Sequence, residues 1–138
     1  MNAQGTLRPP AGGMAPPVTA TLPDRTPLEL RPLARTISEA HFARHPDDRE
    51  RYGEAGMEWC IHDNQHLLNW AALDLAGLLD FDEQLRWLAG VLTSRGYPTE
   101  KLVDNVRTAA AVVSEHAGGE SVQPLADRLA AAADSLTA

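Results

Sequence analysis

One stretch near the middle of the chain combines the side chains best suited to binding or chemistry: two indoles, a carboxylate and an imidazole. Their spacing of i, i+4, i+7 and i+11 places them on one ridge of an α-helix, in the order Trp59, Asp63, His66 and Trp70. Indoles offer apolar surface and the polar pair can orient what enters, so the ridge predicts a pocket wall for a planar or cationic ligand. Two alternatives stay open: the polar pair could bond groups on a facing helix, or the indoles could anchor a protein interface.

Histidine pairs one helical turn apart raise the question of a metal site. His62 and His66 form one such pair, and His41 and His45 repeat the spacing. A pair of this kind is half of a zinc site, but the chain lacks HExxH and the two Glu-x-x-His motifs of di-iron bundles. We therefore expect no metal, and keep His62, His66 and His41 as the candidates should one bind.

Motifs that would indicate catalysis are missing. The sequence has no GxSxG, no P-loop and no GxGxxG motif. Cys60 has no basic group guaranteed near it and is expected to be a buried, small apolar residue rather than a nucleophile. The sequence thus predicts a protein that is not an enzyme.

The elements that must position these residues are predicted to be helices. Apolar residues make up 43% of the chain but aromatic residues only 5%, so leucine, alanine and valine must form the core. From residue 36 onward apolar residues recur at spacings of three and four, and no segment alternates as a strand would. The prediction is an all-α fold, a compact bundle or globin-like array of about five helices.

Caps and breakers predict where these helices begin and end. Thr36 and Glu39 form a capping box that should open a helix to about Arg44. Pro46 should open the next, which becomes regular after Gly53 or Gly56. Helices are therefore expected over residues 36–44, 46–76, 80–96, 99–117 and 121–136. Asp80 and Thr99 are expected to cap two of these helices, and Pro124 to lie in the first turn of the last one.

The N-terminal residues 1–35 carry seven of the ten prolines, which no helix tolerates at that density. We divide the chain into a flexible, poorly structured tail over 1–35 and an all-helical domain over 36–138. The alternative is an extended docking arm that lies in a groove on its own domain or on a partner, because Leu28 and Leu30 alternate with charged residues as a pure linker need not. The apolar residues of such an arm are Val18, Leu22, Leu28, Leu30 and Leu33.

Charge and composition exclude several classes of protein. The formal net charge of −7 argues against a nucleic-acid partner, which needs a basic surface. The chain has no run of 18 apolar residues, so no membrane span is predicted, and it has no continuous apolar h-region, so no secretory signal is predicted. A single cysteine precludes a disulfide within the chain, so we expect a cytoplasmic protein.

Three short motifs carry a resemblance to a known family: RYGEAG at 51–56, CxxDxxHL at 60–67 and WLxxVLxxRGxP at 87–98. They resemble a bacterial helical module often placed beside cobalamin-binding or other sensory and phosphorelay domains. In shape that module is similar to the non-haem globin-like domains of stress-signalling proteins. The resemblance covers roughly residues 40–115.

The resemblance implies a regulatory or sensory domain without chemistry of its own. Cys60, Asp63, His66 and Trp87 occupy positions that match its pattern. No cobalamin-binding, kinase or output module follows the helical region, so such a domain would signal through a partner chain.

We therefore expect a non-enzymatic regulatory or interaction domain, with a protein partner and possible homodimerisation, that acts through the ridge and Trp87. The first alternative is a cofactor-binding protein that holds haem, another tetrapyrrole or a transition ion through His66 or His62. The second is an accessory subunit docked onto an assembly by its N-terminal tail. No cofactor is favoured.

Overall fold

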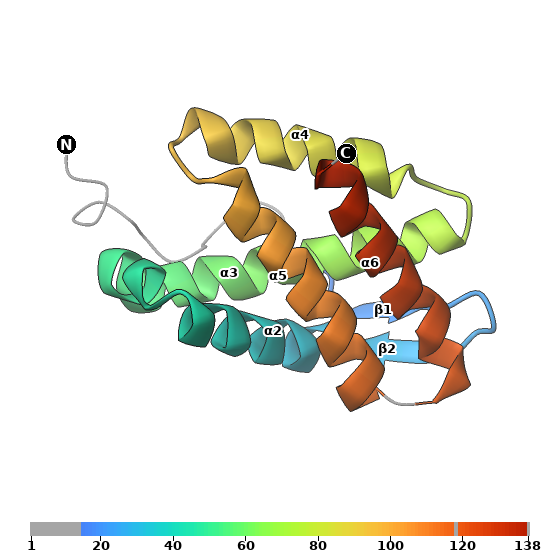
Figure 1. Ribbon diagram of the computed structural model, residues 1–138. Helices are drawn as coiled ribbons and strands as arrows, with labels where there is room; N and C mark the ends of the chain where they lie inside the picture. Colours follow the sequence, from blue (N-terminus) through green and yellow to red (C-terminus); the bar gives the residue numbers. More distant parts are fainter. Residues whose placement is uncertain (1–14, 118, 138) are drawn as a thin grey trace.

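The computed structural model describes residues 15–117 and 119–137 (Figure 1). Five α-helices and one two-stranded sheet lie within them, and the predicted all-helical fold class is confirmed. The elements are β1 (Thr19–Thr21), β2 (Pro27–Glu29), α2 (Leu30–Arg44), α3 (Pro46–Leu75), α4 (Phe81–Ser94), α5 (Thr99–Val112), the π-helical turn η1 (Val113–Ala117), the 3₁₀ turn η2 (Glu120–Val122) and α6 (Gln123–Thr137).

The helices pack as a bundle around one core. Figure 1 shows α5 and α6 side by side across the long helix α3, with α4 above them. The helix α2 packs against α3 and α5, and α4 contacts α6, α3 and α5. Their apolar stripes meet in the interior, as the spacings of three and four require. Fully buried members of the core include Leu30, Ile37, Leu67, Leu68, Phe81, Leu85, Val106, Leu125 and Leu129.

The first helix begins earlier than its sequence signals indicate. The helix α2 starts at Leu30, so Thr36 lies in its interior and donates a hydrogen bond to the Pro32 carbonyl at 3.1 Å. The predicted capping box at Thr36 is therefore wrong. Pro32 sits in the first turn, where its missing N–H breaks no intrahelical bond, and burial of Leu30 favours the earlier start. The predicted end at Arg44 is confirmed.

A β-hairpin precedes this helix. Strands β1 and β2 pair antiparallel, with Thr19 opposite Glu29. Between the two strands, Arg25 has a φ of 72°. Pro23 lies in this turn and Pro27 is the first residue of β2, two positions where a missing backbone N–H is tolerated. Leu22 and Leu28 are buried in the core.

This hairpin corrects the predicted boundary at residue 35. Residues 15–35 are not an unstructured tail, because they form the hairpin and the start of α2. Of the predicted docking-arm leucines, those at 22, 28, 30 and 33 pack on the chain's own domain, whereas Val18 is exposed. The rest of the predicted tail, 1–14, lies outside the described residues.

The long helix α3 is two helices joined at a kink. Gly53 has φ 63° and ψ −154°, a conformation essentially restricted to glycine. Pro46 occupies the first helical position and Asp47 and Asp48 the first turn, as predicted, and regular helix resumes after Gly53. The segment 46–52 lies before the kink, and its Asp47 and Asp48 side chains accept hydrogen bonds from Lys101 near the start of α5.

The remaining boundaries largely follow their sequence signals. The Asp80 carboxylate caps α4 by accepting from the Glu83 amide at 3.1 Å. Thr99 does not cap α5 as predicted; Pro98 holds the capping position, and the Thr99 hydroxyl instead lies 3.2 Å from that of Thr93. No helix in the described part of the chain is long and apolar enough to cross a bilayer.

Candidate functional site

An open cavity of about 580 Å³ lies between α2, α3, α4 and α5, and the turn between α4 and α5 also lines it. Its walls are largely apolar and aromatic, and its polar side chains gather on one side. Residues on both sides of the kink at Gly53 line it, among them Asp48, Tyr52 and Trp59.

The polar side of the cavity is a hydrogen-bonded network built around Asp48. Tyr97 donates from its hydroxyl to Asp48 Oδ2 at 2.7 Å, and Lys101 donates to Asp48 Oδ1 at 2.6 Å. The His41 Nε2 atom lies 3.0 Å from the Tyr97 hydroxyl and 3.3 Å from Asp48 Oδ2. Four side chains from α2, α3, the α4–α5 turn and α5 are thus joined in one network.

Burial and these bonds fix the protonation states of the network. Burial alone would raise the pKa of Asp48, but hydrogen bonds from Lys101 and Tyr97 outweigh it and lower that pKa. Burial and the nearby His45 lower the pKa of His41, which favours the neutral ring. Burial and the Asp48 carboxylate raise the pKa of Tyr97, so its phenol stays protonated.

A second buried polar group lies deeper in the cavity. Asn64 and Asn105 exchange hydrogen bonds, and Asn64 also donates to the Ser38 hydroxyl at 3.2 Å. Cys60 lies one turn from Asn64, and burial raises the pKa of its thiol to about 11. The thiol is therefore protonated at neutral pH, which is the state of an inert cysteine rather than a nucleophile.

Aromatic side chains of α2 and α3 form an aromatic wall of the cavity, namely Phe42, Tyr52 and Trp59. Gly56 lets them meet: a Cβ atom there would lie 2.3 Å from Tyr52 Cβ and 3.6 Å from Phe42 Cζ. A glycine is thus required at position 56, after the kink, because the Tyr52 side chain approaches its backbone closely.

The structure divides the ridge predicted from the sequence. Trp59 and Asp63 line the cavity, whereas His66 and Trp70 do not. Trp70 packs against the core, and Trp87 on α4 is 59% exposed and lies outside the cavity.

The rings on α3 form a ladder that differs from the predicted order. Trp59 meets His62 edge to face at a centroid distance of 5.2 Å, His62 meets His66 at 4.9 Å, and His66 meets Trp70 at 6.2 Å. His62 therefore takes the place expected for Asp63. The Asp63 carboxylate bonds His62 Nδ1 at 3.0 Å and faces the cavity. Burial and His62 lower the pKa of His66.

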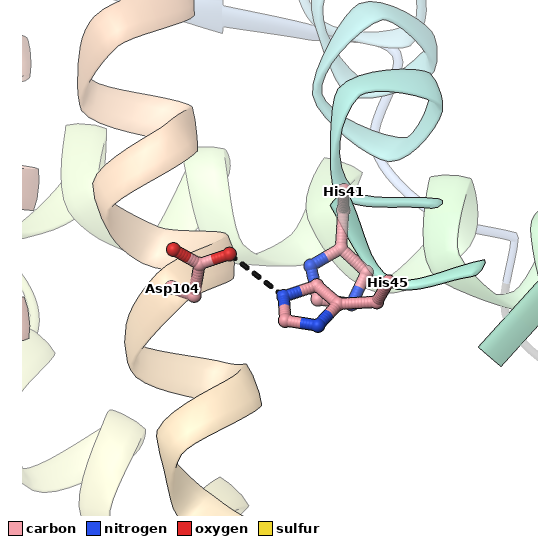
Figure 2. Close-up of side chains that lie close together, drawn as sticks. All are labelled: His41, His45 and Asp104. Atoms are coloured by element: carbon pink, nitrogen blue, oxygen red, sulfur yellow. Dashed lines mark hydrogen bonds and ion pairs between the residues drawn. The ribbon is translucent and has the colours of Figure 1, made fainter. Parts of the chain in front are cut away.

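The histidine pair proposed from spacing on α3 has no third ligand, but the pair on α2 does. Among the residues that the structure describes, the one group able to hold a metal is His41, His45 and Asp104, with ligand atoms within 4.8 Å of one another (Figure 2). His45 Nε2 lies 2.8 Å from Asp104 Oδ2. The sequence showed the His41–His45 spacing but carried no signal for Asp104, which comes from α5.

Two arginines at the rim of the cavity were also missed by sequence reasoning. Arg51 and Arg95 line it, are exposed, and form no salt bridge with any other residue of the described chain. The Arg51 guanidinium lies 5.5 Å from the centre of the Tyr52 ring. The rim thus offers positive charge beside an aromatic wall.

No protein-family model, curated protein or solved structure matches the chain.

Proposed function

We propose that the chain is a non-enzymatic regulatory domain that binds a small organic ligand in the cavity between α2, α3, α4 and α5. The observation that carries the proposal is the cavity itself. Its volume of about 580 Å³ falls within the range of about 300–1,000 Å³ typical of small-molecule sites. Such sites combine mostly apolar walls with a few convergent polar groups, as this one does.

The lining indicates the chemistry of the ligand. Tyr52 and Trp59 provide flat aromatic surface suited to a planar apolar body. Within residues 15–117 and 119–137, neither Arg51 nor Arg95 at the rim forms a salt bridge, and Arg95 acts on the Asp63 carboxylate only through longer-range electrostatics. A guanidinium pairs well with a carboxylate or sulfonate. We therefore propose a planar organic acid, whose ring lies against the aromatic wall and whose anionic group faces the rim.

The polar network supports binding rather than catalysis. The Asp48 carboxylate is held by Lys101 and Tyr97, and the Cys60 thiol is protonated. None of these groups combines a free lone pair with an adjacent base, which nucleophilic catalysis requires. The hydrogen bonds from Tyr97 and Lys101 to Asp48 instead hold these three side chains in place.

A ligand bound in the cavity would act on the outer surface of the domain through α4. That helix supplies Leu88 and Leu92 to the cavity and carries Trp87, 59% exposed, on its outer side. An exposed tryptophan is a typical anchor for a protein interface. In this proposal the cavity occupant changes how α4 is presented to a protein partner.

The test uses anilinonaphthalene sulfonate, a planar apolar dye with one acidic group, and follows its fluorescence on titration with the folded protein. We expect saturable binding, weakened about 10-fold or more by Trp59→Ala or by Arg95→Gln. Trp87→Ala is the matched control, since it removes an indole outside the cavity and should leave the dye affinity unchanged. Equal affinities in Trp59→Ala and Trp87→Ala would show that the dye binds elsewhere and would contradict the proposal.

A further inference from the structure

A buried ring nitrogen on α2 has no partner. His41 is 2% exposed, and its Nδ1 atom forms no hydrogen bond with any described residue. Leaving a buried polar atom unpaired is costly, so such an atom needs an explanation. An ion bound to this nitrogen would remove that free-energy cost.

The tautomer of His41 follows from its other nitrogen. Tyr97 gives its hydroxyl proton to Asp48 Oδ2 at 2.7 Å, so the proton between His41 and these two groups must come from His41 Nε2. A neutral imidazole carries only one N–H. The Nδ1 atom of His41 is therefore a bare lone pair.

Two more ligand atoms lie next to that lone pair. The rings of His41 and His45 have centroids 4.5 Å apart, and one ligand atom each of His41, His45 and Asp104 lies within 4.8 Å of the others. Figure 2 shows the His41 nitrogen nearest its side-chain stem on the side of His45 and Asp104. The two histidines come from the end of α2, and the carboxylate comes from α5.

We propose that His41 Nδ1, His45 Nε2 and the Asp104 carboxylate bind a zinc ion. Two imidazoles and one carboxylate are a known zinc ligand set, which leaves a fourth position for water or another ligand. Tetrahedral zinc places its ligand atoms about 3.3 Å apart, so the present separations must close by at most about 1.5 Å. Rotation of the partly exposed His45 and Asp104 side chains brings the ligand atoms this much closer together.

The surroundings of the three ligands have the features of a zinc site. A ligating histidine usually donates its other N–H to a carboxylate, as His41 does toward Asp48. A ligating carboxylate is itself hydrogen-bonded, and Arg44 donates to Asp104 Oδ1 at 2.7 Å. His45 and Asp104 are each about one-fifth exposed, which gives the ion a path from solvent.

Local backbone geometry explains why this histidine pair differs from the other. His45 has φ −127° and ψ 71°, outside the helical region, because Pro46 ends α2 there. The side chain can therefore turn toward α5, whereas His62 stays on a regular helix and pairs with its neighbour Asp63. The zinc proposal does not depend on the organic ligand proposed for the cavity.

The test is calorimetric titration of the chelator-treated full chain with Zn²⁺, with a parallel Co²⁺ titration read by visible absorption. We expect one equivalent of Zn²⁺ and a Co²⁺ spectrum of low coordination number. Loss of an outer-shell partner typically weakens metal binding 10- to 100-fold. Replacing a ligand, by His45→Gln or Asp104→Asn, should therefore weaken it more than about 100-fold. His62→Gln, which removes a similarly exposed histidine with an aspartate partner, should leave it unchanged.

Two further measurements keep the result interpretable. Circular dichroism of each variant establishes that the fold persists, and Arg44→Gln, which keeps all three ligands but removes a hydrogen bond to Asp104, should weaken Zn²⁺ binding less than His45→Gln or Asp104→Asn does. Wild-type binding weaker than about 1 mM would overturn the proposal. So would binding that survives both His45→Gln and Asp104→Asn, since the ion would then sit elsewhere.

Discussion

The side-chain amides of Asn64 on α3 and Asn105 on α5 face each other in the core and exchange two hydrogen bonds. Asn105 donates to Asn64 Oδ1 at 2.8 Å, and Asn64 donates to Asn105 Oδ1 at 3.2 Å. Because Asn64 also bonds Ser38 on α2, this pair connects three helices at the base of the cavity. The pair specifies one register of these helices, since any slide would bury the amides without partners.

Breaking this pair should destabilise the fold. We expect Asn105→Ala to lower the free energy of unfolding by about 1–3 kcal/mol, because it leaves a buried carbonyl of Asn64 without its donor. The double variant with Asn64→Ala should cost less than the sum of the two single variants, by about 0.5–3 kcal/mol. Urea unfolding of the four proteins measures both. Asn69→Ala on the same helix is the control and should change stability by less than about 0.5 kcal/mol; strict additivity of the two core variants would disprove the coupling.

The hairpin before α2 should contribute to stability as part of the core. Leu28→Ala removes a side chain that is 6% exposed, and we expect a loss of about 2–5 kcal/mol. Val18→Ala, at an exposed position of the same segment, should cost less than about 0.5 kcal/mol. Thermal or urea unfolding compares the two. Similar small effects would mean that the hairpin does not pack on the domain.

Helix ends and the fold class could be predicted because they depend on neighbours in the sequence. Asp80 caps α4 through an amide three residues away, and the stripe of α6 depends only on helical spacing. The start of α2 could not be predicted this way. Pro32 is a signal against helix in isolation, and burial of Leu30 and Leu33 in the assembled core overrides it.

The residues of the candidate site likewise divide into those that helical spacing could place and those that it could not. Trp59 and Asp63 share a face of one helix, so their spacing alone placed them together. Tyr97 and Lys101 reach Asp48 from 49 and 53 residues away. Helix periodicity carries no information on such pairs, because they depend on how α5 crosses the kinked start of α3.

The close packing at Gly56 should make this position intolerant of a side chain. The Cβ of Gly56→Ala would lie 2.3 Å from Tyr52 Cβ, so Tyr52 must move. We expect a loss of about 1–3 kcal/mol in unfolding free energy, together with weaker binding of anilinonaphthalene sulfonate. The matched control is Gly90→Ala on α4, where nothing lies within 4 Å and the better helix former should add up to about 1 kcal/mol. A gain in both variants would contradict the contact.

The ion pair between Asp74 and Arg128 should make stability depend on pH in the acid range. Asp74 lies at the end of α3, where its carboxylate accepts from Arg128 Nε at 3.0 Å and from the Phe81 amide at 2.8 Å. Burial works to raise the pKa of Asp74, but the bonds from Arg128 and Phe81 outweigh it and lower that pKa below its ordinary value. The folded state therefore holds the proton less tightly than the unfolded state.

The sign of the effect follows from this difference. The stabilisation is fully present above the unfolded pKa of about 3.9 and is lost as pH falls through the lower, folded value. We expect Asp74→Asn to cost about 1–3 kcal/mol at neutral pH, and that cost to shrink as the pH falls below about 4. Urea unfolding across this range tests it. Asp134→Asn is the matched control, because its pair with Arg107 is exposed, 75% and 54%, and exposed pairs contribute about 0–1 kcal/mol. A cost for Asp74→Asn that stays constant down to the lowest pH would show that its carboxylate charge does not stabilise the junction of α3, α4 and α6.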